Sequence, residues 1–234
     1  MQKTLGFSLL LLLSGSLFAD NWKHSLSLGL NLTKGNSDTE QINTDYKGNI
    51  NWEKAKASIG LNANFSEENN QKTTENYASF GQFNRYISDR SYWLINGNYE
   101  IDKQANLDNR ILLGPGFGFS FIKTKTSNLD FEGGLAWQST KYTGLSEESN
   151  TAIRIAESFK TDLSTHAKLW QSIEYLGNAE SSSSYIFNGI LGIESSVTGA
   201  LSIKSFINHS YNNSPATGKK KGDTAFTTML VYSF

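Results

Sequence analysis

The chain has 234 residues, no cysteine, and 21 basic against 22 acidic side chains. This length suits one all-β barrel domain, the absent cysteines exclude disulfide bridges and thiolate metal sites, and the balanced charge provides no basic field for nucleic acid. The 20 glycines and two prolines, with many Asn, Ser and Thr, favour strands and turns over helices. The three histidines lie far apart, so neither a metal site nor a cofactor is expected.

Residues 1–19 have the organisation of a secretory signal peptide. Lys3 supplies a positive charge, residues 5–13 form an apolar run, and Ala19 precedes Asp20 after a short break. This order predicts export with cleavage after Ala19, and the run is too short for a transmembrane helix. No cysteine follows the cleavage site, so a lipoprotein anchor is not expected. Residues 20–234 are then expected to form one domain.

Apolar side chains recur at every second position through residues 20–234. In residues 25–33, four leucines alternate with serine, glycine, asparagine and threonine. The same period is found in residues 42–52, 57–65, 74–87, 93–102, 110–121, 129–137, 153–160, 166–175, 185–193, 201–208 and 222–234. A period of two predicts strands with two different surroundings. Residues 74–87 have the weakest pattern, because Tyr77 and Phe83 share one parity and Ala78 and Phe80 the other.

The connections alternate in length and polarity. With the amino-terminus in the periplasm, short periplasmic turns are expected near residues 53–54, 88–90, 123–128, 161–164 and 195–199. Longer, more hydrophilic outward loops are expected at residues 34–38, 66–72, 103–108, 139–150, 177–183 and 212–221. Aromatic residues near the strand ends would form interfacial girdles: Trp22, Trp52, Trp93, Trp137, Tyr175, Tyr185 and Tyr232. Both features are typical of outer-membrane barrels.

The carboxy-terminal segment carries the clearest alternation. From Thr224, every second residue is threonine, apolar or aromatic, and the chain ends on Phe234. Tyr232 and Phe234 are similar to the terminal signal that the barrel-assembly machinery reads. By itself the segment also fits a strand of a soluble barrel or sandwich.

Twelve antiparallel strands of this length can span a bilayer when tilted, and closure removes their edges. The sequence therefore predicts an all-β fold: a closed antiparallel up-and-down transmembrane β-barrel in the bacterial outer membrane, formed by residues 20–234.

Four blocks of the sequence carry a resemblance to a known family. They are residues 32–38 (LTKGNSD), 86–93 (YISDRSYW), 107–118, where LDNR runs into GPGFG, and 215–234, where PATGKK leads to DT and a final YSF. These blocks resemble the salt-induced outer membrane protein family, the YdiY-like proteins, over essentially the whole mature chain. The resemblance implies an outer-membrane β-barrel of a Gram-negative bacterium. It assigns no functional residues, because the family has no agreed biochemical activity.

The parity opposite to the apolar one is expected to face the lumen. Its charged members are Asp45, Lys47, Glu100, Arg110, Glu132, Arg154, Lys168, Glu174, Glu194 and Lys204. Mixed signs can build salt-bridge networks or line a narrow aqueous path. Structural packing is the favoured interpretation, with at least one Arg–carboxylate pair spanning neighbouring strands and narrowing the lumen. Such a barrel would be structural, or a narrow pore for ions or small solutes.

Gly114, Gly116 and Gly118 lie inside a predicted strand, and no helix follows them. This context argues against a phosphate-binding loop. On an inner face, glycine is expected to relieve curvature or to make room for a bulky neighbour.

The alternative class is a barrel enzyme, a hydrolase acting on lipid or peptide. His209 is expected near the outer end of its strand, and Ser205 on the same parity lies roughly 13 Å away, too far for a catalytic pair. Only a serine from a neighbouring strand could complete such a site, so no catalytic activity is expected. His24 and His166 are interpreted as residues of the lumen or near turns.

The expected partners are outer-membrane lipids and lipopolysaccharide, and the barrel-assembly machinery during biogenesis. The basic run Lys219–Lys221 could contact lipopolysaccharide phosphates or be a solvated loop tip. No nucleic acid is expected to bind, and the protein is expected to be a monomer.

Overall fold

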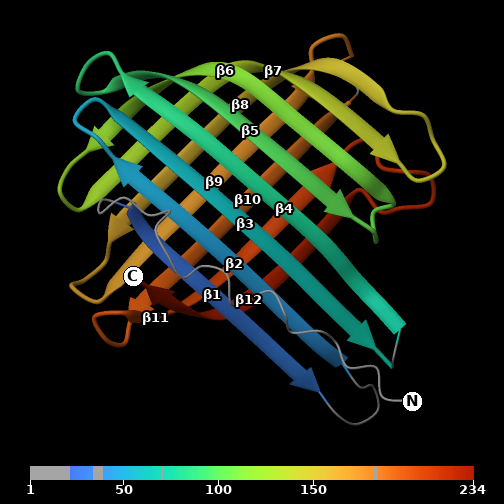
Figure 1. Ribbon diagram of the computed structural model, residues 1–234, viewed down its shortest axis with the longest axis horizontal. Coiled ribbons are helices and arrows are strands. Elements are labelled where there is room, and N and C mark those ends of the chain that lie inside the picture. The colour runs from blue at the N-terminus through green and yellow to red at the C-terminus, as the bar shows by residue number, and fades with distance from the viewer. Residues whose placement is uncertain (1–21, 34–38, 70, 182–183) are drawn as a thin grey trace.

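The computed structural model describes residues 22–33, 39–69, 71–181 and 184–234 and consists of strands joined by short turns (Figure 1). The strands are β1 (Trp22–Thr33), β2 (Thr39–Asn51), β3 (Ala55–Glu68), β4 (Gln71–Tyr86), β5 (Ser91–Asp102), β6 (Leu107–Lys123), β7 (Ser127–Tyr142), β8 (Glu148–Asp162), β9 (Ala167–Asn178), β10 (Tyr185–Ser196), β11 (Leu201–Asn212) and β12 (Gly222–Ser233). Each pairs antiparallel with the next, and β12 returns to β1, so the sheet is a closed barrel. The predicted fold class is confirmed. The predicted signal peptide lies outside the described residues.

The outer face of the barrel is apolar. On β6, Leu113 and Phe117 are 55% and 51% exposed, whereas Leu112 on the opposite parity is 2% exposed. Leu191 on β10 and Ile59 on β3 are likewise exposed, and Phe187 is half-buried. Such a face is unfavourable in water but favourable in a bilayer, because lipid tails solvate apolar side chains. Closure of the sheet provides hydrogen-bond partners for the backbone groups inside the membrane. The described residues contain no helical segment with the length and hydropathy of a membrane span.

The weak pattern of β4 is resolved by register. Phe83 pairs with Ala57 and Ile95, so Phe83 and Tyr77 lie on the outward parity. Phe80 and Ala78 lie on the inward parity, where Ala78 pairs with Glu100. The inward Phe80 is accommodated because its neighbour on β3 is Gly60, and a Cβ there would overlap the Phe80 ring.

The expected outward loop at residues 66–72 is wrong. β3 runs to Glu68 and β4 begins at Gln71, and Asn69 in the connection has a positive φ of 51°. Polar residues outside the bilayer can continue a hydrogen-bonded ladder, here Glu67 with Lys72 after a register shift, so polarity did not mark the strand end. The same effect shortens the expected connections at 123–128 and 139–150, because β6 reaches Lys123 and β7 reaches Tyr142. The loop at 34–38 lies outside the described residues.

Candidate functional site: the charged lumen

The centre of the lumen is organised around Arg154 of β8. Its Nη1 lies 2.9 Å from Oε2 of Glu132 on β7, and its Nε lies 2.7 Å from Oε2 of Glu174 on β9. The side chains of Arg154 and Glu132 are each 12% exposed. Inward parity on three adjacent strands brings these groups together, so one guanidinium holds two carboxylates through charge-assisted hydrogen bonds.

Glu132 is also held from strands farther around the barrel. Its Oε1 accepts hydrogen bonds from the Tyr92 hydroxyl at 3.0 Å and from Gln82 Nε2 at 2.8 Å. Tyr92 on β5, Gly118 on β6 and Glu132 on β7 form one register row. A Cβ at Gly118 would overlap the Tyr92 ring, so the glycine lets tyrosine reach across β6. The expectation that inward glycines make room for bulky neighbours is confirmed here.

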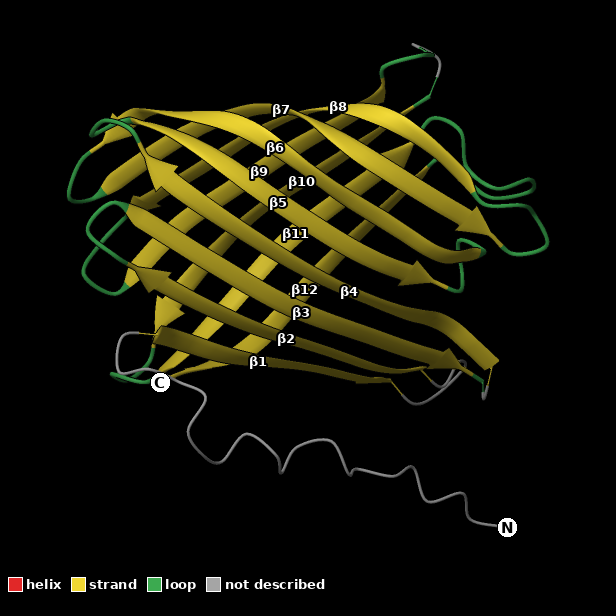
Figure 2. Ribbon diagram, turned by 45° about the horizontal axis from the view of Figure 1, so that its top comes forward, coloured by secondary structure: helices red, strands yellow, loops and turns green. Residues whose placement is uncertain are grey.

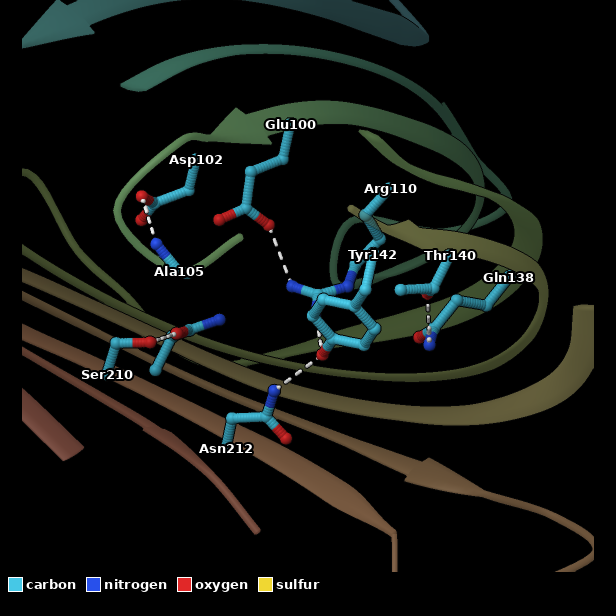
Figure 3. Close-up of polar contacts among 10 residues, drawn as sticks. Glu100, Asp102, Ala105, Arg110, Gln138, Thr140, Tyr142, Ser210 and Asn212 are labelled. Carbon is cyan, nitrogen blue, oxygen red and sulfur yellow. Dashed lines mark hydrogen bonds and ion pairs between the residues drawn. The ribbon is translucent and has the colours of Figure 1, made fainter. Parts of the chain in front are cut away.

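A second network lies at the outer mouth, where β5 ends and β6 begins (Figure 3). Arg110 Nη1 lies 2.9 Å from Glu100 Oε2, and Arg110 Nη2 donates to the Tyr142 hydroxyl at 3.4 Å. The same hydroxyl accepts from Asn212 Nδ2 at 3.1 Å. Because Tyr142 is on β7 and Asn212 on β11, this contact crosses the mouth and narrows it.

A third set of contacts lies toward the opposite end of the barrel, where β1 begins and β12 ends. Lys204 of β11 is 6% exposed, and its Nζ lies 2.7 Å from Asp45 Oδ2 of β2, so the pair passes over β12 and β1. Lys168 and Glu194 pair at 2.9 Å between β9 and β10. Lys47 Nζ lies 5.7 Å from the centroid of the Trp170 ring, which joins β2 to β9.

All ten charges expected in the lumen therefore make contacts with inward-parity residues, and nine of them form ion pairs. Three Arg–carboxylate pairs join neighbouring strands, as expected from the sequence. Around Arg154 and Lys204, where these side chains are largely buried, losing one partner leaves a charge without compensation. The charges thus act as braces between strands rather than as a row of free groups along a wide channel.

The lumen also has an apolar wall. Leu112, Ala136, Ala152, Leu176 and Ile186 form a buried apolar cluster on the inward parity of β6 to β10. They lie nearer the outer strand ends than Arg154 does. Apolar residues on the polar parity were the available signal, but periodicity alone could not show that they meet.

The histidines do not assemble a hydrolase site. His209 Nδ1 lies 2.8 Å from Thr224 Oγ1, and Ser205 Oγ lies 2.9 Å from Thr228 Oγ1, so each pairs with a threonine of β12. His24 is not in the lumen: it is on the outward parity, buried against the rings of Trp22, Tyr46 and Phe234. His166 lies in a turn. Among the described residues, no three His, Asp or Glu side chains gather where they could hold a metal ion.

An apolar outer wall, a closed ladder of twelve strands and a braced polar interior define a transmembrane β-barrel of the outer-membrane class. Residues 26–234 match the model of a family described as "Protein of unknown function, DUF481", and the chain belongs to this family. The uncharacterized protein YdiY of Escherichia coli K12 is 21% identical over 215 residues, covering 89% of this chain and 82% of YdiY. The resemblance to the YdiY-like proteins is confirmed.

Solved structures with the same architecture have little sequence in common with this chain. The NanC porin matches with a TM-score of 0.56 at 8% identity, covering 90% of this chain and 98% of that one. The translocator domain of the autotransporter NalP from Neisseria meningitidis matches with a TM-score of 0.50 at 12% identity, covering 91% and 88%. At these identities the comparisons establish the barrel fold alone.

Proposed function

We propose that the exported mature protein is an integral outer-membrane barrel without catalytic activity, whose braced lumen passes only ions or small solutes. The observation that carries the proposal is the bridge from Arg110 through Tyr142 to Asn212, which crosses the outer mouth. The ion pairs around Arg154 support it, because they place three charged side chains on the inward face of β7, β8 and β9 below the mouth. Porin-like neighbours are compatible with a pore, and the lumen contacts argue for a narrow one.

The test is the conductance of refolded protein in planar bilayers at several salt concentrations. Wild-type protein should give small, ion-level steps. Tyr142→Ala removes the bridging hydroxyl and ring and should raise the step size, since Arg110 and Asn212 then no longer meet through it. Tyr175→Ala is the matched control, because Tyr175 has outward parity near the outer end of β9 and should leave conductance unchanged. Wide porin-like steps in the wild type would refute the proposal.

Export, cleavage after Ala19 and residence in the outer membrane as a monomer belong to the same proposal. The apolar residues 5–13 support export and cleavage, and the terminal Phe234 supports residence in the outer membrane. Mature protein should fractionate with outer membranes and migrate faster on unheated gels than after boiling. Recovery in the soluble periplasm would contradict it.

Induction by salt is a further element, supported by the family resemblance. Its test is the abundance of the protein in cells grown with and without added sodium chloride, and equal abundance would count against it.

A further inference from the structure

The seam between β1 and β12 is paired over only part of its length. β1 pairs with β2 from Trp22 to Thr33, and β12 pairs with β11 from Gly222 to Tyr232. Between β1 and β12, the pairing of the described residues runs from His24–Phe234 to Leu28–Leu230, and the strands still touch at Gly29, where a Cβ would lie 2.8 Å from the Thr228 carbonyl oxygen. In Figure 2 the two strands lie together near the C-terminus and separate toward their far ends. The seam is therefore closed on the periplasmic side and open toward the outer leaflet.

Side-chain exposure marks the same place. Phe226 and Leu30 are 69% and 63% exposed, more than any other large apolar residue in a described strand. On β12 the exposed residues include both parities, since Asp223 and Ala225 face inward and Thr224 and Phe226 outward. Closer to the paired part, the inward Met229 is buried. The outer half of β12 is thus exposed on both faces, and Phe226 on it is the most exposed large apolar residue of the described strands.

Polar groups gather on the lipid-facing side of this opening. The His209–Thr224 and Ser205–Thr228 pairs lie on the outward parity of β11 and β12. Polar side chains are rarely placed toward lipid, because hydrocarbon offers them no partners. Unpaired backbone groups at the seam meet the same difficulty. The two side-chain pairs satisfy each other, so it is the backbone groups left without a ladder partner at the seam that an occupant with hydrogen-bonding oxygens and an apolar part would complete.

The positive charge beside the opening favours an anionic occupant. The connection 213–221 leads directly into β12 and contains Lys219, Lys220 and Lys221 but no acidic residue. Lys220 and Lys221 are exposed, and Lys221 Nζ lies 3.1 Å from Asn213 Oδ1. A phosphate group is held well by lysine ammonium groups, and an acyl chain matches Leu30 and Phe226.

We propose that the outer half of the β1–β12 seam binds an anionic, phosphate-bearing lipid of the outer leaflet. Its acyl chain lies between Leu30 and Phe226, its polar oxygens face the open strand edges, and its phosphate lies at Lys219–Lys221. This inference rests on the membrane location in the proposed function but not on conduction, so a failure of conductance leaves it intact.

Binding can be measured by native mass spectrometry of refolded protein in detergent, with phosphatidylglycerol and phosphatidylcholine of the same acyl chains as probes. Wild-type protein should retain phosphatidylglycerol about tenfold better. The double variant Lys220→Gln/Lys221→Gln should bind the two lipids about equally, a loss of the tenfold preference, because each lysine near an anionic lipid is worth about fivefold in binding and two together are enough to account for it. Lys141→Gln is the control, because Lys141 is an exposed lysine at the outer end of β7.

The seam can be closed with an engineered disulfide. The chain has no cysteine of its own, so only the introduced pair can react. Leu30→Cys/Thr228→Cys continues the observed register into the open half, and Leu28→Cys/Leu230→Cys places the same pair in the closed half. The control pair should oxidise fully without affecting lipid binding. The open-half pair should oxidise more slowly, and its oxidised form should lose phosphatidylglycerol relative to its reduced form, which also verifies folding.

Three outcomes would overturn the proposal. One is equal retention of the two lipids by wild-type protein. Another is equally fast oxidation of both cysteine pairs, which would mean that the seam is closed throughout. The third is a dimer that disappears on oxidation of the open-half pair, because the occupant would then be a strand of a second copy.

Discussion

The backbones of His24 and Phe234 hydrogen-bond to each other in both directions, at 2.9 and 3.0 Å, so the last residue of the chain extends the ladder of the first strand. Their rings stack with centroids 5.4 Å apart. Because β1 and β12 pair over few residues, this contact is a large share of what closes the barrel. The terminal aromatic residue thus has a structural role in addition to any role as an assembly signal.

Deleting Phe234 should lower the amount of assembled barrel while export continues, because both the terminal contact and the proposed signal are lost. Heat-modifiable migration of outer-membrane fractions measures assembly, and signal-peptide processing measures export. Phe131→Ala is the control, since Phe131 is an exposed aromatic residue on the outward parity of β7. Unchanged assembly without Phe234 would remove the signal interpretation.

Arg154→Met should lower the free energy of unfolding by about 3–5 kcal/mol, because Glu132 and Glu174 would remain poorly hydrated without their cation. Urea unfolding of the refolded barrel, followed by tryptophan fluorescence, provides the measurement. Lys160→Met removes one positive charge from the same face of β8, but Lys160 is exposed, so stability should be nearly unchanged. If both variants unfold alike, the pairs around Arg154 are not braces.

Gly118→Ala should destabilise the barrel by about 1–3 kcal/mol, because the new methyl group would overlap the Tyr92 ring and displace it from Glu132. Gly133→Ala is the matched change on the adjacent strand, where a Cβ meets nothing within 4 Å. Thermal or urea unfolding of both variants tests the difference. A Gly118 variant as stable as the Gly133 variant would show that Tyr92 can reach Glu132 by another path.

Leu191→Arg should cost about 2–4 kcal/mol in lipid, because the outward face of β10 meets hydrocarbon. Asn188→Arg on the inward face of the same strand should cost less. Equal penalties at 188 and 191, measured by unfolding in lipid vesicles, would indicate a core on both faces of the sheet.

The sequence by itself determined the class of fold. The number of strands and the direction in which each side chain faces follow from period-two alternation. Alternation is a local property of the sequence and does not depend on which strands pair. Leu112 and Leu113, for example, differ in parity and therefore in surroundings. The expectation that Arg110, Arg154 and the carboxylates share one parity followed for the same reason. The strand ends were less predictable, as residues 66–72 show, because polar residues outside the bilayer can extend a ladder as readily as end it.

Only the tertiary structure decided which residues meet. Lys204 and Asp45 are 159 positions apart and pair because closure places β11 and β2 on either side of the seam. Tyr92 reaches Glu132 because the register puts Gly118 between them. The apolar wall at Leu112 and Leu176 and the partly open seam beyond Leu28 have the same origin. Register and closure are nonlocal, and period-two alternation carries no information about them.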